Sequence, residues 1–279
     1  MKTIDALRWG ENRLKECAVE NARQESVWVM SEKVLETDSS DGKWMLDRES
    51  ELSSGQMERF RSIVEKRCKG EPLAYLLGSQ EFIGLDFVVD NRVLVPQPET
   101  ETLVTRALSY LNGISKPSIA DVGTGSGIIA VILAQKLAEC SVWATDLSAP
   151  ALDVAVKNAM IHKIDAQVRF VQGELPFRSE SFDAVVSNPP YIRTGDLEEL
   201  PREVRCEPRI ALDGGTDGQR VIFSIAAQSF RCLKSGGALF VETGFDGAQD
   251  TAAIFKKCGF EKIEITKDFA GIERVVSGI

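Results

Sequence analysis

Histidine is almost absent from this chain, which limits the chemistry that it can perform. His162 is the one histidine among 279 residues, and the six cysteines include no C-x-x-C pair. Because zinc sites are built mainly from closely spaced Cys and His ligands, we expect no metal site. A Ser-His-Asp or Cys-His mechanism would have to rest on His162, which lies in a helical pattern and is expected at the surface.

Long apolar runs and a secretory leader are also missing. The longest stretch without a polar side chain, Gly127–Ala134, is far shorter than the roughly 20 residues that a membrane helix needs. The chain begins MKTIDALRWGENRLKE, which contains neither the apolar core nor the cleavage site of a signal peptide. We therefore expect a cytoplasmic protein that does not contact membranes.

The chain has no excess of positive charge. It carries 33 Lys and Arg against 42 Asp and Glu residues, a formal net charge of −9. Affinity for the backbone of nucleic acids comes from clustered Lys and Arg, so this balance argues against a protein that coats DNA or RNA. A local basic patch is not excluded, and the nearest arginine cluster is Arg202, Arg205 and Arg209. We expect no stable nucleic-acid partner.

The N-terminal part has the pattern of a small helical bundle. Apolar residues recur at helical spacing in three segments, Thr3–Val19, Ser26–Leu35 and Gly55–Lys69. Ser53 and Gln56 have the spacing of a capping box before the third helix, and Gly70 is a suitable stop. The length of the chain suits one large domain or a medium domain with a smaller companion. We place the helical domain at residues 1–78.

Strand-like and helix-like segments alternate in the remainder. A β-hairpin linker at residues 79–97 is expected from Glu81–Gly84, Leu85–Asp90 and Val93–Pro96. A second domain, at 98–279, opens with helix Glu99–Leu111. Its expected strands are Ser118–Val122, Ser141–Thr145, Gln167–Val171, Asp183–Ser187, Ala238–Glu242, Lys262–Thr266 and Arg274–Ser277. Its further helices are Ile128–Ala138, Ala149–His162, Gly218–Leu233 and Ala248–Cys258. This alternation predicts an α/β fold with a parallel sheet covered on both faces, and an antiparallel final hairpin at one edge.

A glycine-rich loop ends the first strand of that sheet. It reads Asp121-Val-Gly-Thr-Gly-Ser-Gly127 and runs directly into a helix. Such glycines allow a ligand to approach the backbone at the positive end of the helix. The spacing is not the G-x-G-x-x-G of dinucleotide-binding proteins, which argues against a nicotinamide dehydrogenase. Asp121 suits a ligand that carries a positive charge near the loop.

Asp146 closes the next strand, where an acidic side chain is expected to accept hydrogen bonds from two ribose hydroxyls. The glycine loop without further support is equally compatible with a turn that binds nothing. Strand, loop, helix and Asp146 together predict a nucleoside cofactor.

The segment Ser187-Asn-Pro-Pro-Tyr191 follows the fourth strand, at the sheet edge that faces the ligand crevice. Two prolines stiffen the backbone and remove two N–H donors, so nearby carbonyls are held outward. The Asn188 side-chain oxygen and the Pro189 carbonyl could then receive both hydrogens of a planar –NH2 group, while Tyr191 offers a ring to pack against it. The alternative is a stiff turn that only ends a strand.

These motifs resemble those of class I S-adenosylmethionine-dependent methyltransferases that act on amino groups. More narrowly, the chain resembles the release factor glutamine methyltransferase family, which methylates the side-chain amide of the glutamine in the Gly-Gly-Gln tripeptide of peptide chain release factors. The resemblance extends over nearly the whole chain. It includes Glu71–Gly78, Glu81-Phe82, Val95–Glu101, Asp121–Gly127, Asp146, Ser187–Ile192, Glu207-Pro208, Gly236-Gly237 and Lys267–Val276.

The resemblance implies a five-helix substrate-recognition domain, a hairpin linker and a seven-stranded Rossmann-like methyltransferase domain. It implies S-adenosyl-L-methionine as cofactor, S-adenosyl-L-homocysteine as product and release factors as protein partners; we expect a monomer. The residues that it assigns to the cofactor are Asp121, Gly123, Thr124, Gly125, Ser126 and Gly127 for the methionine part, Asp146 for the ribose, Glu174 and Leu175 for adenine, and Asn188. The residues that it assigns to the substrate amide are Asn188, Pro189, Pro190 and Tyr191, with Asn188, Pro189 and Tyr191 as the catalytic ones.

Three positions depart from the family pattern. Gln97 stands where the family usually has Arg, which affects closure of the site. Leu175 replaces a frequent aromatic residue beside adenine, and Cys206 occupies a position that is often aromatic. None of the three belongs to the Asn188–Tyr191 motif.

Two other functions remain open at this point. A methyltransferase acting on the adenine amino group of DNA or RNA shares the N-P-P-Y motif and would use the same clamp on a flipped base. The net charge of −9 and the segments Glu71–Gly78 and Pro96–Glu101 argue against it. A non-catalytic nucleoside-binding adaptor would dock partners through the helical domain, and the intact Asn188–Tyr191 motif argues against that function.

Overall fold

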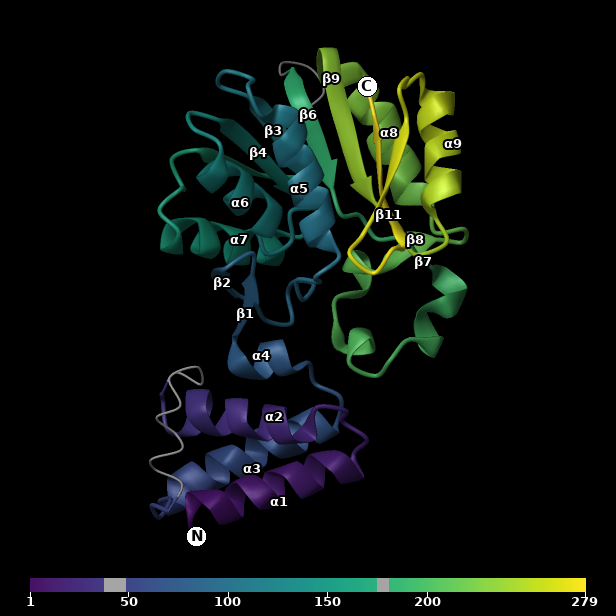
Figure 1. Ribbon diagram of the computed structural model, residues 1–279. Helices are drawn as coiled ribbons and strands as arrows, with labels where there is room; N and C mark the ends of the chain where they lie inside the picture. Colours follow the sequence, from purple (N-terminus) through teal and green to yellow (C-terminus); the bar gives the residue numbers. More distant parts are fainter. Residues whose placement is uncertain (38–48, 175–180) are drawn as a thin grey trace. The chain divides into compact units, whose positions relative to one another are not determined.

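The computed structural model describes residues 1–37, 49–174 and 181–279 (Figure 1). The chain forms two compact units, Met1–Ser79 with Pro201–Cys206, and Gln80–Leu200 with Glu207–Ile279. We call them the helical unit and the sheet unit. Among the described residues, no helix is both long enough and apolar enough to cross a membrane.

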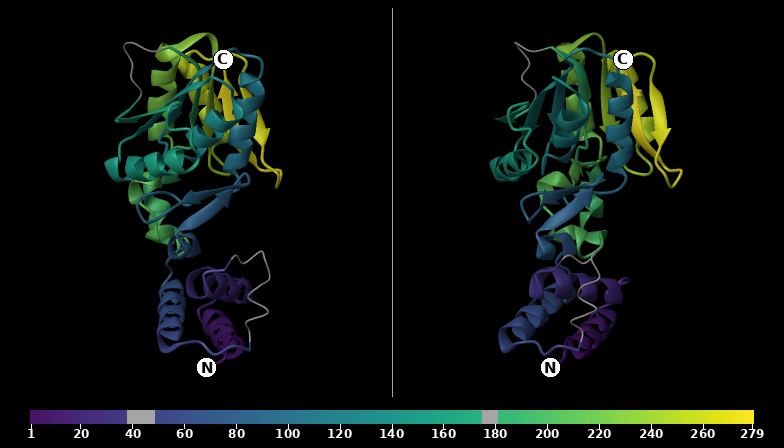
Figure 2. Two further views of the ribbon diagram at one scale, coloured as in Figure 1. Left: turned by 90° about the vertical axis from the view of Figure 1, so that its left-hand side faces the viewer. Right: turned by 60° about the vertical axis from the view of Figure 1, so that its left-hand side comes forward.

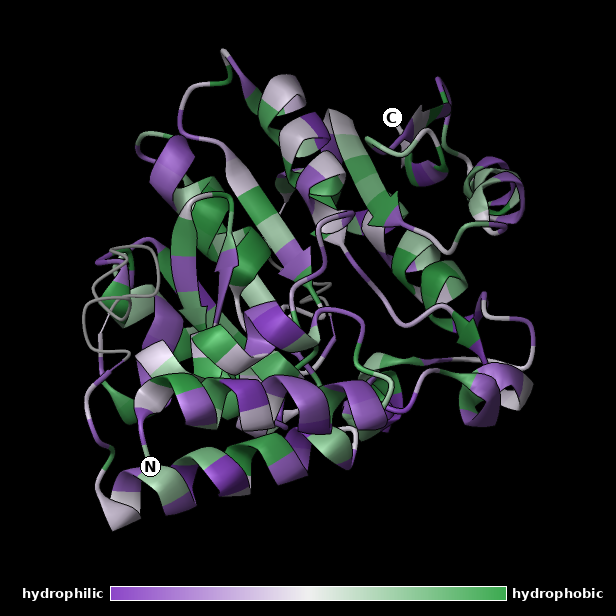
Figure 3. Ribbon diagram, turned by 60° about the horizontal axis from the view of Figure 1, so that its bottom comes forward, coloured by the Kyte–Doolittle hydropathy of each residue, from purple (hydrophilic) through white to green (hydrophobic). Residues whose placement is uncertain are grey.

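The helical unit is built from amphipathic helices. Its elements are α1 (Thr3–Glu16), α2 (Ala22–Trp28), the π-helical η1 (Val29–Val34), α3 (Ser54–Cys68) and α4 (Leu73–Leu77). Hydrophilic and hydrophobic residues alternate along these helices (Figure 3), and the apolar ones form a buried core that includes Leu14, Met30 and Phe60. The three predicted helices are confirmed, although the second changes from α to π winding. The described part therefore has four α-helices and one π segment where the resemblance implied five helices.

Both predicted ends of α3 are confirmed. Ser53 Oγ accepts a hydrogen bond from the Gln56 backbone N–H, and the Gln56 side chain accepts one from the Ser53 N–H. Gly70, just beyond the helix, has a φ of 94°, a conformation that L-residues with a side chain rarely adopt. Local chemistry alone therefore determines where this helix begins and ends.

An ion-pair network attaches Pro201–Cys206 to the helical unit. The partly buried Arg67 guanidinium lies 2.7 Å from Glu25 and 2.6 Å from Glu203. Arg202 lies so close to Gly70 that an added Cβ there would be 2.6 Å from the Arg202 side chain. A segment that follows the N-P-P-Y motif in sequence thus packs on the surface of the helical unit.

Cys17 and Cys68 form a disulfide at the ends of α1 and α3, with their Cα atoms 5.3 Å apart. The sequence contained no motif that pointed to this pair. Disulfides are rare in the reducing cytoplasm, which is the compartment expected from the sequence.

Reduction of this disulfide is expected to destabilise the helical unit. The bond closes a loop with a sequence separation of 51 residues, and restricting the unfolded chain in this way contributes about 4 kcal/mol. Thermal unfolding with and without a thiol reductant measures the effect, and Cys17→Ser is the control that should not respond to reductant. An unchanged wild-type Tm in reductant would contradict the expectation.

The sheet unit contains a seven-stranded sheet in the order β10-β11-β9-β6-β3-β4-β5. Strands β3, β4, β5, β6 and β9 are parallel, whereas β11 is antiparallel to both β9 and β10. The strands are β3 (Ser118–Val122), β4 (Ser141–Asp146), β5 (Val168–Gln172), β6 (Phe182–Ser187), β9 (Leu233–Glu242), β10 (Glu264–Lys267) and β11 (Glu273–Gly278). All seven predicted strands and the antiparallel edge hairpin are confirmed.

Helices cover both faces of this sheet (Figures 1 and 2). Successive strand residues point to opposite sides: Ile119 packs into the core on the side of α5, α6 and α7, and Ala120 into the core on the side of α8 and α9. These helices are α5 (Thr100–Leu111), α6 (Ile128–Lys136), α7 (Ala149–Ile161), α8 (Arg220–Cys232) and α9 (Ala248–Cys258). The apolar run Gly127–Ala134 proves to be the buried start of α6.

The hairpin region differs from its prediction in one respect. Strands β1 (Ser79–Phe82) and β2 (Leu85–Val88) form a separate two-stranded sheet, as expected. Val93–Pro96 is not a strand, so that prediction was wrong. The Val95 N–H donates to the Glu207 carboxylate at 2.9 Å instead of to a neighbouring strand, and Pro96 has no N–H to offer.

Short elements between Tyr191 and Arg220 were not predicted. They are β7 (Ile192–Arg193), β8 (Asp213–Gly215) and the 3-10 turns η3 (Thr194–Glu199), η4 (Val204–Cys206) and η5 (Arg209–Ala211). Strands of two or three residues are too short to show a period of two.

Candidate active site

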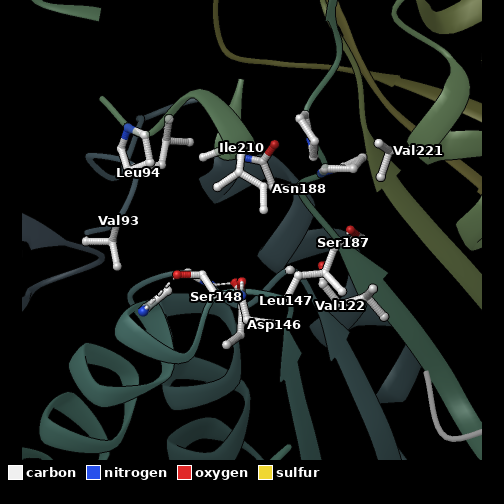
Figure 4. A pocket seen from close by; sticks show the side chains of 18 of the residues that line it. Val93, Leu94, Val122, Asp146, Leu147, Ser148, Ser187, Asn188, Ile210 and Val221 are labelled. Carbon is white, nitrogen blue, oxygen red and sulfur yellow. Dashed lines mark hydrogen bonds between the residues drawn. The ribbon is translucent and has the colours of Figure 1, made fainter. Parts of the chain in front are cut away.

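A cavity of about 670 Å³ opens at the carboxyl ends of β3, β4 and β6 (Figure 4). From β3 the chain moves outward through β4 and β5 and then returns to β6 on the other side of β3. Ligands of open α/β sheets bind at such a reversal of strand order. The lining residues come from Arg92–Gln97, Thr100, Val122–Ser126, Ile128–Ile129, Asp146–Ser148, Ala151, Gly173–Glu174, Ser187–Pro190, Pro208–Ala211, Asp213 and α8 between Arg220 and Gln228.

The glycine loop adopts a conformation that requires its glycines. Gly123, Gly125 and Gly127 have φ angles of 71°, 56° and 83°, in the left-handed region where glycine is favoured. A Cβ added to Gly123 or Gly125 would meet no atom within 4 Å, whereas one on Gly127 would lie 3.0 Å from Ala155. The first two glycines leave open space beside the loop, and the third allows α6 to pack closely against α7.

Asp146 braces the loop from the end of β4. Its Oδ2 accepts a hydrogen bond from the Gly125 N–H at 2.9 Å, and its Oδ1 accepts one from the Ser148 N–H at 2.8 Å. Each carboxylate oxygen keeps a second lone pair, and the residue lines the cavity. Asp146 therefore has acceptor capacity left for hydroxyl groups of a ligand.

Asp121 lies behind the loop and is not among the residues that line the cavity. Its Oδ2 accepts hydrogen bonds from the Thr124 hydroxyl at 2.6 Å and from the Ala130 N–H at 3.1 Å. Oδ1 is buried without a partner among the described residues, and burial raises the pKa of this carboxyl to about 7. The carboxyl thus holds the loop in place from behind, while Oδ1 stays enclosed by the protein.

The residues of the N-P-P-Y motif, Asn188–Tyr191, do not all face the cavity. Asn188, Pro189 and Pro190 line the cavity, and Tyr191 does not. The Tyr191 ring packs against the core on the α8 and α9 side, and its phenol is close to the Glu242 carboxylate; burial is the main cause of its raised pKa. A role of the Tyr191 ring in binding the substrate amide stays a prediction.

Asn188 is connected to two buried residues that the sequence did not mark individually. Its Nδ2 donates to Thr100 Oγ1 at 3.0 Å, and Thr100 Oγ1 donates to Glu242 Oε2 at 2.7 Å. Thr100 and Glu242 are each 1% exposed. Burial is the main cause that raises the pKa of Glu242, to about 7.

The remaining predicted positions lie around or outside the cavity. Glu174 lines it and accepts a hydrogen bond from Gln228 Nε2 at 2.6 Å. Leu175 lies outside the described residues. Gln97 lines the cavity and donates to the Val95 carbonyl at 3.1 Å, whereas Cys206 is an exposed free thiol in the helical unit.

His162 has a structural contact and does not line the cavity. It is partly buried rather than fully at the surface; its ring packs on Phe87, with centroids 5.0 Å apart, and Nε2 lies 2.9 Å from the Asp86 carbonyl. In the described part of the chain, no group of three His, Cys, Asp or Glu side chains is arranged to hold a metal ion.

Much of the apolar cavity wall was missed at the sequence level. Figure 4 shows Val93, Leu94, Ile210 and Val221 around the cavity together with Asn188 and Asp146. Apolar residues on a connecting segment or a helix look the same in sequence whether they face a core or a ligand. The sequence marked only the neighbouring segments Val95–Glu101 and Glu207-Pro208, which the family shares and which contribute Val95, Pro96 and Pro208 to the wall.

Comparison with known proteins decides the family. The chain matches the PrmC N-terminal domain over residues 5–78 and the methyltransferase small domain over residues 100–201. A release factor glutamine methyltransferase of Geobacter sulfurreducens is 41% identical over 275 residues, covering 98% of this chain and 94% of the relative. The chain belongs to the release factor glutamine methyltransferase family.

Other relatives agree with this membership. The family member of Clostridium acetobutylicum is 36% identical over 284 residues, covering 100% of this chain and 99% of the relative. Among solved structures, a methyltransferase from Pyrococcus furiosus has a TM-score of 0.51 at 20% identity, covering 71% of this chain and 89% of that one. The hMettl16 catalytic domain in complex with MAT2A 3'UTR hairpin 1 has a TM-score of 0.57 at 14% identity, covering 81% and 80%. At such identities these likenesses show the methyltransferase fold alone.

Proposed function

We propose that this enzyme transfers a methyl group from S-adenosyl-L-methionine to the side-chain amide nitrogen of the glutamine in the Gly-Gly-Gln segment of peptide chain release factors. The observation that carries the proposal is the position of Asn188 and Pro189 in the wall of the same cavity as Asp146 and the glycine loop. Membership of the release factor glutamine methyltransferase family supports the choice of substrate.

The residues around the glycine loop fit the proposed cofactor. The open space beside Gly123 and Gly125 admits a chain close to the backbone, and Asp146 offers acceptors to a ribose. Asp121, which the resemblance assigns to the cofactor, acts in this proposal through Oδ2, whose hydrogen bonds from the Thr124 hydroxyl and the Ala130 N–H hold the loop. Thr124, Ser126, Gly127, Glu174 and Asn188 complete the proposed cofactor site, in which the sulfonium supplies an activated methyl group.

The task of the protein is to orient a poor nucleophile. An amide nitrogen reacts slowly because its lone pair is delocalised into the carbonyl. Two N–H···O bonds, to Asn188 Oδ1 and the Pro189 carbonyl, would aim the nitrogen at the methyl group and favour the positive charge that develops on it. The amide proton becomes acidic only as the new bond forms, so no strong base is needed before attack.

The finer assignments belong to the same proposal. Residues 1–78 form the substrate-recognition domain, 79–97 the linker and 98–279 the catalytic domain. Pro190 and Tyr191 support the amide site. The enzyme acts as a monomer in the cytoplasm, with a release factor as transient partner and without a stable nucleic-acid partner.

Labelled S-adenosylmethionine offered with purified release factor and, in parallel, with duplex DNA tests the function. Label in the peptide that contains the Gly-Gly-Gln glutamine is expected, and a release factor with that glutamine changed to alanine is the matched control. Label on DNA alone, or equal label on the glutamine-less factor, would refute the proposal.

A further inference from the structure

We infer that Thr100 and Glu242 are positioning residues that hold the side-chain amide of Asn188 with its oxygen directed at the substrate. The inference rests on the proposed function, since it concerns the orientation of the group that would bind the glutamine amide. It also assigns a function to Thr100, which belongs to the family-shared segment Val95–Glu101. That segment takes no part in the proposed hydrogen bonds from the substrate amide to Asn188 and Pro189.

The three side chains form a continuous buried chain of hydrogen bonds. Thr100 lies in the first turn of α5, and Glu242 is the last residue of β9. In the sheet, Ser187 pairs with Val241, so the next residues, Asn188 and Glu242, lie beside each other where β6 and β9 end. The Thr100 hydroxyl joins them, at 3.0 Å from Asn188 Nδ2 and 2.7 Å from Glu242 Oε2.

The carboxylate of Glu242 determines which group donates and which accepts in these hydrogen bonds. An ionised carboxylate only accepts hydrogen bonds, so the single hydroxyl proton of Thr100 must point to Glu242. The lone pairs of Thr100 Oγ1 are then left for Asn188, and they can be satisfied only by the Asn188 –NH2 group. The Asn188 oxygen is thereby turned away from Thr100, and it becomes the acceptor that a substrate –NH2 needs.

Glu242 also lies near the far end of the N-P-P-Y motif. The Tyr191 phenol is close enough to this carboxylate for each group to affect the pKa of the other. The nearby Arg274 guanidinium pairs with Asp268 at 3.2 Å and donates to the Thr243 carbonyl at 3.2 Å, and its positive charge opposes the burial that raises the pKa of Glu242. Glu99 is the other charged group that acts on this carboxyl.

Protonation of Glu242 would release the constraint. A neutral Glu242 carries an O–H that can donate to Thr100, whose own proton is then free to donate to the Asn188 oxygen and reverse the amide. Because burial places the Glu242 pKa at about 7, kcat is expected to rise with pH through this range. Glu242→Gln should be slower than wild type and should lose the part of the rise that Glu242 causes. Asp121, with a pKa also at about 7, titrates in both proteins, so its effect cancels when the two pH profiles are compared.

Paired variants of Thr100 test the inference by steady-state methylation of release factor. Thr100→Val keeps the shape and removes the hydroxyl, so kcat is expected to fall by about 10- to 100-fold while the Kd for cofactor stays within about twofold. Thr100→Ser keeps the hydroxyl and loses the methyl group, and it should retain at least about half of the wild-type kcat. Thr102→Val, at another buried threonine of α5, is the matched control.

The outcomes separate positioning from packing and from the proposed function. A Thr100→Val enzyme with wild-type kcat overturns the inference. So does a Thr100→Ser enzyme that is impaired as strongly as Thr100→Val, because a packing role depends on the methyl group. Failure of the wild-type enzyme to label release factor would instead refute the proposed function. Melting temperatures and cofactor binding verify that each variant is folded.

Discussion

Replacing Asn188 with alanine is expected to abolish methyl transfer, lowering kcat by about 1000-fold. The variant loses the side-chain acceptor that would orient the glutamine nitrogen, and a single preorganised hydrogen-bonding group in an active site contributes about 100- to 1000-fold. Loss of orientation adds to this, because attack requires the nitrogen in line with the methyl group. Single-turnover assays with purified release factor at saturating cofactor measure the effect.

Cofactor binding should survive this substitution. The glycine loop and Asp146 do not depend on Asn188 for any hydrogen bond, so most of the affinity for S-adenosylhomocysteine should remain. The same substitution at the exposed Asn112, which follows α5, is the control and should leave turnover unchanged. Near-normal turnover by Asn188→Ala with release factor would eliminate the amide clamp as the source of catalysis.

The second large effect is expected for Asp146→Asn, through cofactor affinity. The two carboxylate oxygens accept from the Gly125 and Ser148 N–H groups. An asparagine presents –NH2 to one of them, which leaves a backbone donor unpaired at about 1–3 kcal/mol and removes an acceptor for the ribose. We expect the Kd for S-adenosylhomocysteine to rise by about 100-fold by calorimetry, with kcat at saturating cofactor near that of wild type.

Asp165→Asn is the matched control for Asp146→Asn. Asp165 is an exposed acidic residue just beyond α7, so the change removes the same charge away from the cavity. Its cofactor affinity should equal that of wild type. If Asp146→Asn also bound the cofactor normally, the assignment of Asp146 to the ribose would be wrong.

Features with a local cause were predicted well from the sequence. Ser118–Val122 was predicted to be a strand and is one, because a short apolar run followed by glycines has few other solutions in an α/β pattern. The capping box at Ser53 was predicted because its partners lie three residues apart. The glycine loop was recognisable for the same reason, since left-handed φ angles require glycine at specific positions.

The errors arose where local signals were weak. Val93–Pro96 has strand-forming residues, yet it pairs through a carboxylate far along the chain and lines a cavity. The association of Pro201–Cys206 with the helical unit depends on Arg67 and Glu25, which no local pattern connects to Glu203. The Cys17–Cys68 pair likewise results from how α1 and α3 pack.

The active site also combines features that local sequence determines with features that only tertiary packing determines. The amino-acid order already contained the glycine loop, the acid after β4 and the Asn-Pro-Pro-Tyr segment, because each works through its own backbone and neighbours in sequence. It did not reveal that Thr100 and Glu242, 142 positions apart, would meet behind Asn188. Their meeting depends on the register between β6 and β9 and on the packing of α5 against the sheet. Both are set by burial of side chains from distant segments, which is why folding had to bring this support for the clamp together.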